Sequence, residues 1–129
     1  MAEKDSKRRF TEQVTELLRA FQTSTPGVVG VGLISVDGFT IASEMPESVG
    51  DQTVAAMAAA MLVLGEQTTN ELHEGQLVRV FVEGTDGYMI IMNAGRESML
   101  SVVARKDAKL GLVFLQMQRT AEGIRAAMS

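Results

Sequence analysis

The sequence predicts an α+β fold, in which one five-stranded antiparallel sheet carries helices on both of its faces. Three observations predict it: an uncharged, alanine-rich stretch in the middle of the chain, strand-like segments on either side of it, and apolar residues at helical spacing towards both ends. The predicted order is α-β-β-α-β-β-β-α, with the first and last helices on one face and the central helix on the other. We expect residues 1–129 to form a single domain whose residues 1–5 are frayed.

The composition argues against several classes of protein. A net charge of −4 argues against a general nucleic-acid-binding or anionic-membrane surface. The absence of cysteine excludes disulfides and thiolate chemistry. The apolar run at residues 52–65 is shorter than the ~20 residues of a membrane span, and no signal peptide is recognised. We therefore expect a cytoplasmic protein with no direct membrane insertion.

Residues from about Ser6 to Thr23 are predicted to form an amphipathic helix, which the Pro26-Gly27 turn ends. Its apolar residues recur at helical spacing and are Phe10, Val14, Leu17, Leu18 and Phe21. The basic cluster Lys7-Arg8-Arg9 could contact an anionic partner. Acidic residues lie close to it in sequence, however, which favours a solvated first turn.

Five strands are predicted from β-branched and apolar runs between turn signals. They comprise residues 28–35, 39–43, 76–83, 88–93 and 98–104. The first is a nearly continuous apolar run, which indicates a central strand covered on both faces, and Asp37-Gly38 is a hairpin turn signal. Gly30 and Gly32 point to the same side of that strand, where bare backbone would let a helix sit close.

The central helix is predicted to run from an N-cap at Asp51 to a left-handed C-terminal residue at Gly75. One apolar stripe comprises Val54, Met57, Ala58, Met61, Gly65, Thr68 and Leu72, with Leu64 at its edge. The opposite face is apolar only in its first half, at Ala55, Ala56, Ala59, Ala60 and Val63. Because small residues let two helices approach closely, a second copy of the chain is the simplest cover for this half.

Residues 76–83 are expected to form an edge strand with few charges, and an unprotected edge is a template for pairing with another chain. The edge and the alanine face together predict a homodimer, although a terminus or a loop could cover the edge instead. The predicted dimer interface comprises Ala55, Ala56, Ala59, Ala60, Val63, Leu77, Arg79 and Phe81.

The last helix is predicted to follow Asp107, which can act as its cap. The residues of its buried stripe are Leu110, Phe114, Met117, Ala121 and Ile124. Like the first helix, it therefore presents one apolar face to the sheet.

No catalytic, cofactor or metal site is recognised. His73 is the only histidine and there is no cysteine, which argues against a zinc site. The glycines of residues 27–32 lie within a strand and lack the spacing of a phosphate loop. Arg79, Arg96 and Arg105 could contact carboxylates or phosphates, although a solvated surface arginine explains each one singly. We predict that the protein is not an enzyme and needs no cofactor.

The order of elements and several short segments resemble the Roadblock/dynein light chain family. The segments that carry the resemblance are Val29-Gly30-Val31-Gly32, Val36-Asp37-Gly38-Phe39-Thr40-Ile41-Ala42, the small-residue central helix, Leu77–Val82, Gly87-Tyr88-Met89-Ile90-Ile91 and Leu110-Gly111. The resemblance covers nearly the whole chain and suggests a small, prokaryotic, single-domain member. It implies a homodimer or heterodimer whose central helices pack antiparallel and whose third strands pair.

The resemblance also implies a Ras-like small GTPase as partner, which the dimer would regulate or scaffold. Bacterial polarity regulators of this family stimulate GTP hydrolysis without inserting an arginine finger, so no catalytic residue is transferred to this chain. The proposed partner-binding residues are Glu66, Gln67, Asn70 and Glu71, on the polar second half of the central helix. The alternatives are a small-molecule sensor, a purely structural dimerisation module and an enzyme with carboxylate-only chemistry.

Overall fold

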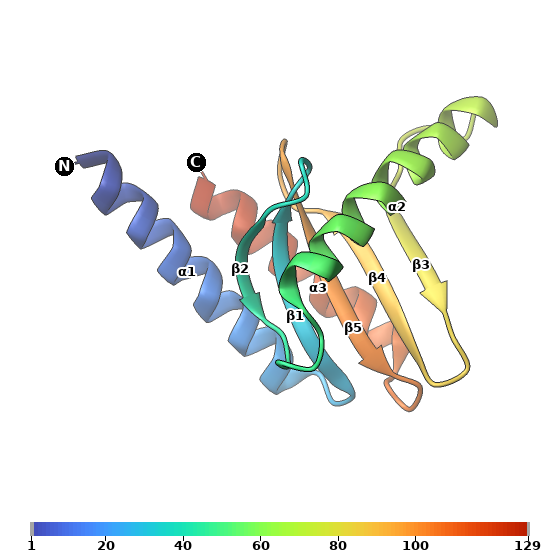
Figure 1. Cartoon of the computed structure of the whole chain (residues 1–129), viewed down its shortest axis with the longest axis horizontal. Helices are drawn as coiled ribbons and strands as arrows, with labels where there is room; N and C mark the ends of the chain where they lie inside the picture. The colour runs from blue at the N-terminus through green and yellow to red at the C-terminus, as the bar shows by residue number, and fades with distance from the viewer. Residues whose placement is uncertain (1, 129) are drawn as a thin grey trace.

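The computed structural model describes residues 2–128 and has the predicted order of elements (Figure 1). The elements are α1 (Ala2–Ser24), β1 (Val28–Ser35), β2 (Thr40–Glu44), α2 (Asp51–Glu71), β3 (Arg79–Glu83), β4 (Gly87–Asn93), β5 (Ser98–Arg105) and α3 (Leu110–Met128). Helix α1 begins at Ala2, earlier than the predicted start near Ser6. Met1 lies outside the described residues, and fraying of the residues that follow it stays a prediction.

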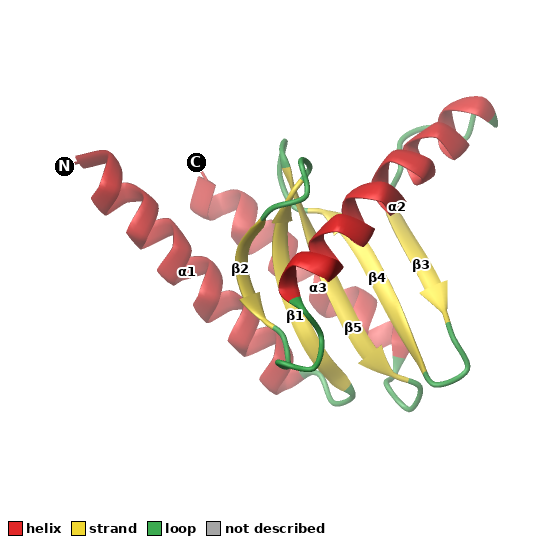
Figure 2. Cartoon of the chain, viewed as in Figure 1, coloured by secondary structure: helices red, strands yellow, loops and turns green. Residues whose placement is uncertain are grey.

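The five strands form one antiparallel sheet in the order β2-β1-β5-β4-β3 (Figure 2). Strand β1 lies between β2 and β5 and is buried almost throughout, which confirms the prediction of an inner strand. Among the described residues, strand β3 lies at one edge of the sheet and pairs only with β4. The predicted edge strand is therefore confirmed, but it is regular only from Arg79.

Helices α1 and α3 cover one face of the sheet, and α2 crosses the other, as predicted (Figures 1 and 2). The first face holds the larger core, in which Leu18 and Phe21 of α1 and Met117 and Ile124 of α3 pack on the strands. All four of these side chains are buried. Of the predicted stripe on α3, Leu110 and Phe114 are only partly buried.

The smaller core lies under α2, where the buried residues are Val54, Ala55, Ala58 and Leu62. This corrects the predicted stripe, in which Met57, Thr68 and Leu72, with Leu64 at its edge, are exposed. Compared with the prediction, α2 is rotated about its axis so that Ala55 and Leu62 face the sheet. A helix whose residues are apolar on most sides gives no periodic signal that fixes which side is buried.

Neither predicted end of α2 is correct in detail. Gly50 occupies the N-cap position, and the Asp51 carboxylate accepts a hydrogen bond from Ser43 Oγ at 2.8 Å instead of capping the helix. The helix ends at Glu71, so Gly75, which has the predicted positive φ (84°), lies beyond the helix end. His73 follows in the left-handed region with φ of 53°, and it belongs to a turn that satisfies the last carbonyls of the helix.

Two further local predictions are corrected. The space over Gly30 is filled by Met45 and Pro46 of the segment that leads into α2, so a connecting loop, and not a helix, sits close to the bare backbone. Asp107 does not cap α3, which begins at Leu110; its carboxylate accepts from Arg105 Nε at 3.3 Å.

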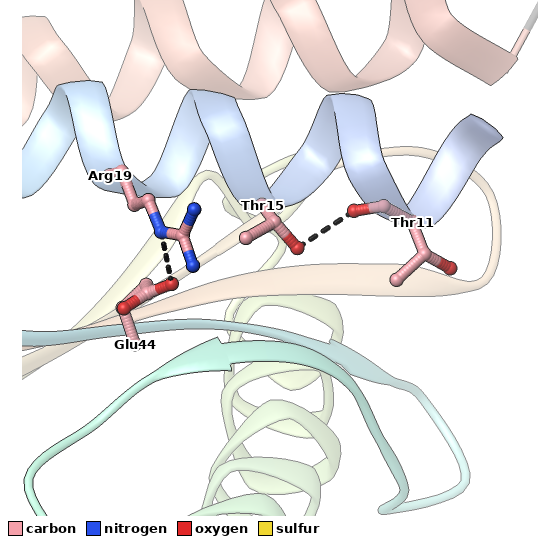
Figure 3. A network of polar contacts seen from close by, with 4 residues as sticks. All are labelled: Thr11, Thr15, Arg19 and Glu44. Atoms are coloured by element: carbon pink, nitrogen blue, oxygen red, sulfur yellow. Dashed lines mark hydrogen bonds and ion pairs between the residues drawn. The ribbon is translucent and has the colours of Figure 1, made fainter. Parts of the chain in front are cut away.

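An ion pair ties α1 to the β2 edge of the sheet. Arg19 Nε donates to Glu44 Oε1 at 2.8 Å, and Thr15 Oγ1 donates to the Thr11 carbonyl one turn away on the same helix (Figure 3). Helix α1 thus lies along β2 (Figure 1), whereas Glu83 of β3 pairs with Lys106 of the connection between β5 and α3. The two edges of the sheet are therefore not equivalent.

Candidate interaction surface

Strand β3 is the exposed edge of the sheet. All of its residues except Val80, which is half-buried, are exposed. Phe81 retains 38% of its accessible surface and Val82 48%, which is unusual for large apolar side chains in a strand. The outward-facing backbone N–H and C=O groups along the free edge of β3 can pair with another strand.

The outer face of α2 is also apolar and exposed. Its residues that point away from the sheet are Ala56, Met57, Ala60, Val63 and Leu64, followed by Gln67 and Glu71. Leu64 keeps 65% of its accessible surface. The stripe is therefore apolar from Ala56 to Leu64 and polar at its C-terminal end.

The exposed apolar residues of α2 and β3 belong to one region of the molecule. Seven of the ten large apolar residues that are exposed in the described chain lie on α2, on β3 or on the segment between them: Met57, Val63, Leu64, Leu72, Val78, Phe81 and Val82. The helix and strand adjoin, because Gly65 of α2 faces Val80 of β3. Exposed apolar side chains gathered on two adjoining elements mark a candidate site of association.

The residues predicted for the dimer interface differ in their exposure to solvent. Ala56, Ala60, Val63, Arg79 and Phe81 are exposed in this region. Ala55 differs from the prediction, because it has no accessible surface and packs against the sheet within its own chain. Ala59 and Leu77 are half-buried: Ala59 lies beside the Gly38 turn, and Leu77 lies under Gly65.

Sequence reasoning missed two features of α2 and its surroundings. Met57 and Leu64 were placed on the buried side, although they are exposed. Phe39 is 65% exposed on the turn between β1 and β2, and Gln52 Nε2 of α2 donates to the Gly38 carbonyl of the same turn at 3.1 Å. The Asp-Gly signal could locate this turn, but nothing in the sequence indicates that it rests on α2.

Side chains on the α3 side of β3 and β4 form an aromatic and charged cluster. The Phe81 ring stacks on Tyr88 at a centroid distance of 5.3 Å and meets the Phe114 ring edge-on at 6.1 Å. The Arg79 guanidinium lies over Phe114, 4.6 Å from its centroid. This cluster attaches the edge strand to α3.

Lys106 extends the same cluster at its other end. Its ammonium donates to Glu83 Oε2 and lies 4.7 Å from the Tyr88 ring centroid. The hydrogen bond to Glu83 raises the pKa of Lys106 above its ordinary value, and exposure to solvent keeps the pair screened.

The four proposed partner-binding residues are all exposed, but they do not share one face. Gln67 and Glu71 continue the outer stripe of α2. Glu66 and Asn70 instead border a hollow of about 350 Å³ between the end of α2 and the β4–β5 turn, where Arg96 lies on the opposite side.

In the described part of the chain, no group of three or more histidine or acidic side chains could hold a metal ion. Within residues 2–128, no helix combines the length and hydropathy of a membrane span. His73 belongs to the turn after α2, and Arg105 pairs with Asp107.

Comparison with known families identifies the domain. The family model described as the Roadblock/LC7 domain matches residues 14–104. The chain belongs to the Roadblock/LC7 family. The match runs from the middle of α1 to the end of β5, so it includes both α2 and β3 of the Roadblock domain.

Relatives and solved structures agree with this assignment. An uncharacterized protein of Methanocaldococcus jannaschii is 37% identical over 102 residues, which are 79% of this chain and 89% of the relative. A Roadblock/LC7 domain from Streptomyces avermitilis superposes with a TM-score of 0.84 at 20% identity, covering 88% of this chain and 96% of that one. The gliding protein MglB of Thermus thermophilus superposes at 0.81 with 21% identity, covering 92% and 90%. At these identities the two structures share the fold of this Roadblock domain.

Proposed function

We propose that this Roadblock domain forms a two-fold homodimer through the outer face of α2 and the free edge of β3. The observation that carries the proposal is the concentration of exposed apolar side chains on these two adjoining elements. Alanine at positions 56 and 60 lets a second helix approach closely. The unpaired edge of β3 offers main-chain hydrogen bonds to the same partner.

We further propose that the dimer is a non-catalytic module that regulates or scaffolds a Ras-like small GTPase. Membership of the Roadblock/LC7 family supports this function, because the family resemblance implies such a partner. The polar end of α2, with Glu66, Gln67, Asn70 and Glu71, stays outside the apolar stripe and would be presented twice by a dimer. Polar rims around an apolar centre are usual for regulated interfaces.

The whole chain is proposed to act as one domain. The matched residues end at 104, before α3. Helix α3 nevertheless supplies Val113, Met117 and Ile124 to the larger core, so separating it would expose this core. A truncation after Arg105 that stays folded and dimeric would contradict the single-domain proposal.

A binding assay against small GTPases tests the proposed partner. The purified dimer is used to capture GTPases from the source organism, loaded with GDP or with a GTP analogue. The double variant Glu66→Lys, Glu71→Lys should weaken capture, because acidic residues at a rim steer a basic partner. Glu122→Lys, an exposed change on α3, is the matched control. Failure to capture any GTPase in either state would refute the proposed partner.

A small-molecule sensor is the second candidate, and one observation favours it. The hollow beside Glu66 and Asn70 has Arg96 on its other side, so groups of both charges border it. A thermal-shift screen against nucleotides and metabolites separates the two functions, because a ligand of the native state must raise the melting temperature.

A further inference from the structure

The free edge of β3 presents a definite set of backbone groups. Gly84 N–H donates to the Gly87 carbonyl, so this pair begins the hydrogen-bonded positions of the β3–β4 ladder. Such pairs alternate along an antiparallel ladder. Val82 and Val80 therefore bond to β4, and Arg79, Phe81 and Glu83 turn their N–H and C=O groups outward.

A second copy of β3 can pair with this edge only in certain registers. A two-fold axis perpendicular to the sheet keeps each side chain on its own face. Directly opposite residues of an antiparallel pair point to the same face, and side chains alternate between the two faces along each strand. An odd-numbered residue must therefore lie opposite an odd-numbered residue of the second copy, and an even-numbered residue opposite an even-numbered one. The axis must then pass beside one residue, and that residue meets its own copy.

The extent of the regular strand selects Phe81 as that residue. Leu77 and Val80 both contact Gly65 of α2, although side chains three residues apart in an extended strand point to opposite faces. The chain is thus not extended before Arg79, and the strand Arg79–Glu83 has Phe81 at its centre. A register centred there uses all three outward-facing residues of each copy.

Charge complementarity selects the same register. Centring on Phe81 places Arg79 opposite Glu83 of the second copy, on the α3 side of the sheet, and the two-fold axis repeats the pair. Centring on Val80 would set Glu83 opposite Leu77, and centring on Val82 would set it opposite Phe81. Cross-strand pairs of opposite charge are favourable, and only the register centred on Phe81 forms them.

Within one chain, the side chains of Arg79 and Glu83 are both available to form these pairs. Within residues 2–128, Arg79 has no carboxylate at ion-pair distance and lies only over Phe114. Glu83 uses Oε2 for Lys106, which leaves Oε1 for a second cation. Phe81 would meet its own copy and join the two aromatic clusters across the axis.

We infer that β3 binds β3 of a second copy in an antiparallel register centred on Phe81, in which Arg79 of each chain pairs with Glu83 of the other. This inference rests on the proposed homodimer and adds its register. The two ion pairs would lie at opposite ends of the shared ladder, on either side of the paired Phe81 rings.

Disulfide trapping tests the register directly, because the chain has no cysteine of its own. Phe81→Cys should link two copies on mild oxidation, since directly opposite Cα atoms lie ~5.5 Å apart, within the range of a disulfide. Val80→Cys alone should not link, because the two copies would be diagonal neighbours ~7–8 Å apart. A mixture of Val80→Cys and Val82→Cys chains should link, and this readout keeps Phe81 intact.

Charge reversal tests the ion pairs. Arg79→Glu and Glu83→Arg should each weaken the homodimer by roughly 2- to 30-fold, the effect expected of two exposed pairs. A mixture of the two variants restores opposite charges at both positions and should form heterodimers preferentially. Arg19→Glu breaks an exposed ion pair at the opposite edge of the sheet and should leave dimerisation unchanged.

The outcomes separate this inference from the proposed function. A wild-type chain that stays monomeric in light scattering overturns the homodimer and this register together. A dimer in which Val80→Cys or Val82→Cys links alone, and Phe81→Cys does not, overturns the register only. If the heterodimers bind no more tightly than the two single-variant homodimers, the proposed ion pairs between Arg79 and Glu83 are wrong.

Discussion

Gly65 of α2 lies so close to Val80 of β3 that a Cβ atom on this glycine would stand 2.7 Å from Val80 Cγ2. It would also approach Leu77 Cδ2 at 3.1 Å. The helix therefore contacts the edge strand through bare backbone, and the two parts of the proposed interface are held in a fixed relation. This contact requires a small residue at one position of α2.

Gly65→Ala should destabilise the protein although alanine is the better helix former. The added methyl must displace the stiff Val80 side chain, and overpacking of this kind costs ~1–3 kcal/mol. Gly111→Ala in α3 is the control, because no atom lies within 4 Å of its Cβ position. Urea denaturation should give opposite signs for the two variants, and an equal gain in stability for both would contradict the close contact.

His73→Gly should stabilise the protein by about 1 kcal/mol. His73 N–H and Glu74 N–H donate to the carbonyls of Asn70 and Thr69, which makes His73 the left-handed residue of a Schellman motif. Glycine adopts this conformation without the strain of a Cβ atom. His73→Ala keeps that strain and serves as the control; thermal or urea unfolding in which alanine matches glycine would show that the backbone conformation is not responsible.

The ion pair between Arg19 and Glu44 should contribute little compared with the core beneath it. Arg19→Ala should cost less than ~1 kcal/mol, because the arginine side chain is largely exposed, and the loss should shrink as salt is added. Phe21→Ala, in the same helix, should cost ~3–5 kcal/mol because Phe21 is buried. Unfolding measured at low and high salt compares the two variants, and equal losses would contradict this ranking.

The order of elements was predictable because each has a local signal. Apolar residues at helical spacing mark α1, and Leu18 and Phe21 are buried as that spacing predicts. The nearly continuous apolar run of β1 correctly predicted an inner strand. These signals arise from the faces that each element presents to the core, so one sequence suffices to see them.

The orientation of α2 was not predictable in the same way. Alanine, methionine and leucine occur around most of its circumference, so periodicity does not distinguish Ala55, which is buried, from Ala56, which is exposed. Contacts with distant residues decide it, such as Gly65 against Val80. The predicted N-cap of α2 was wrong for a related reason. The Asp51 carboxylate accepts a hydrogen bond from Ser43 of β2, and the local sequence does not reveal this partner.

Ala60→Glu should convert the proposed dimer into a folded monomer. Ala60 is exposed and is the outward-facing residue nearest the middle of α2, where two antiparallel helices would cross. A glutamate there would bury an unpaired charge from each copy, which should weaken dimerisation by more than ~100-fold. Ala60 gives a clearer test than half-buried Ala59, because a glutamate at position 59 would also destabilise the folded monomer. Ala126→Glu, at an exposed position of α3, is the control and should dimerise like the wild type. Light scattering with circular dichroism measures mass and folding together, and an Ala60→Glu chain of unchanged dimer mass would exclude α2 from the interface.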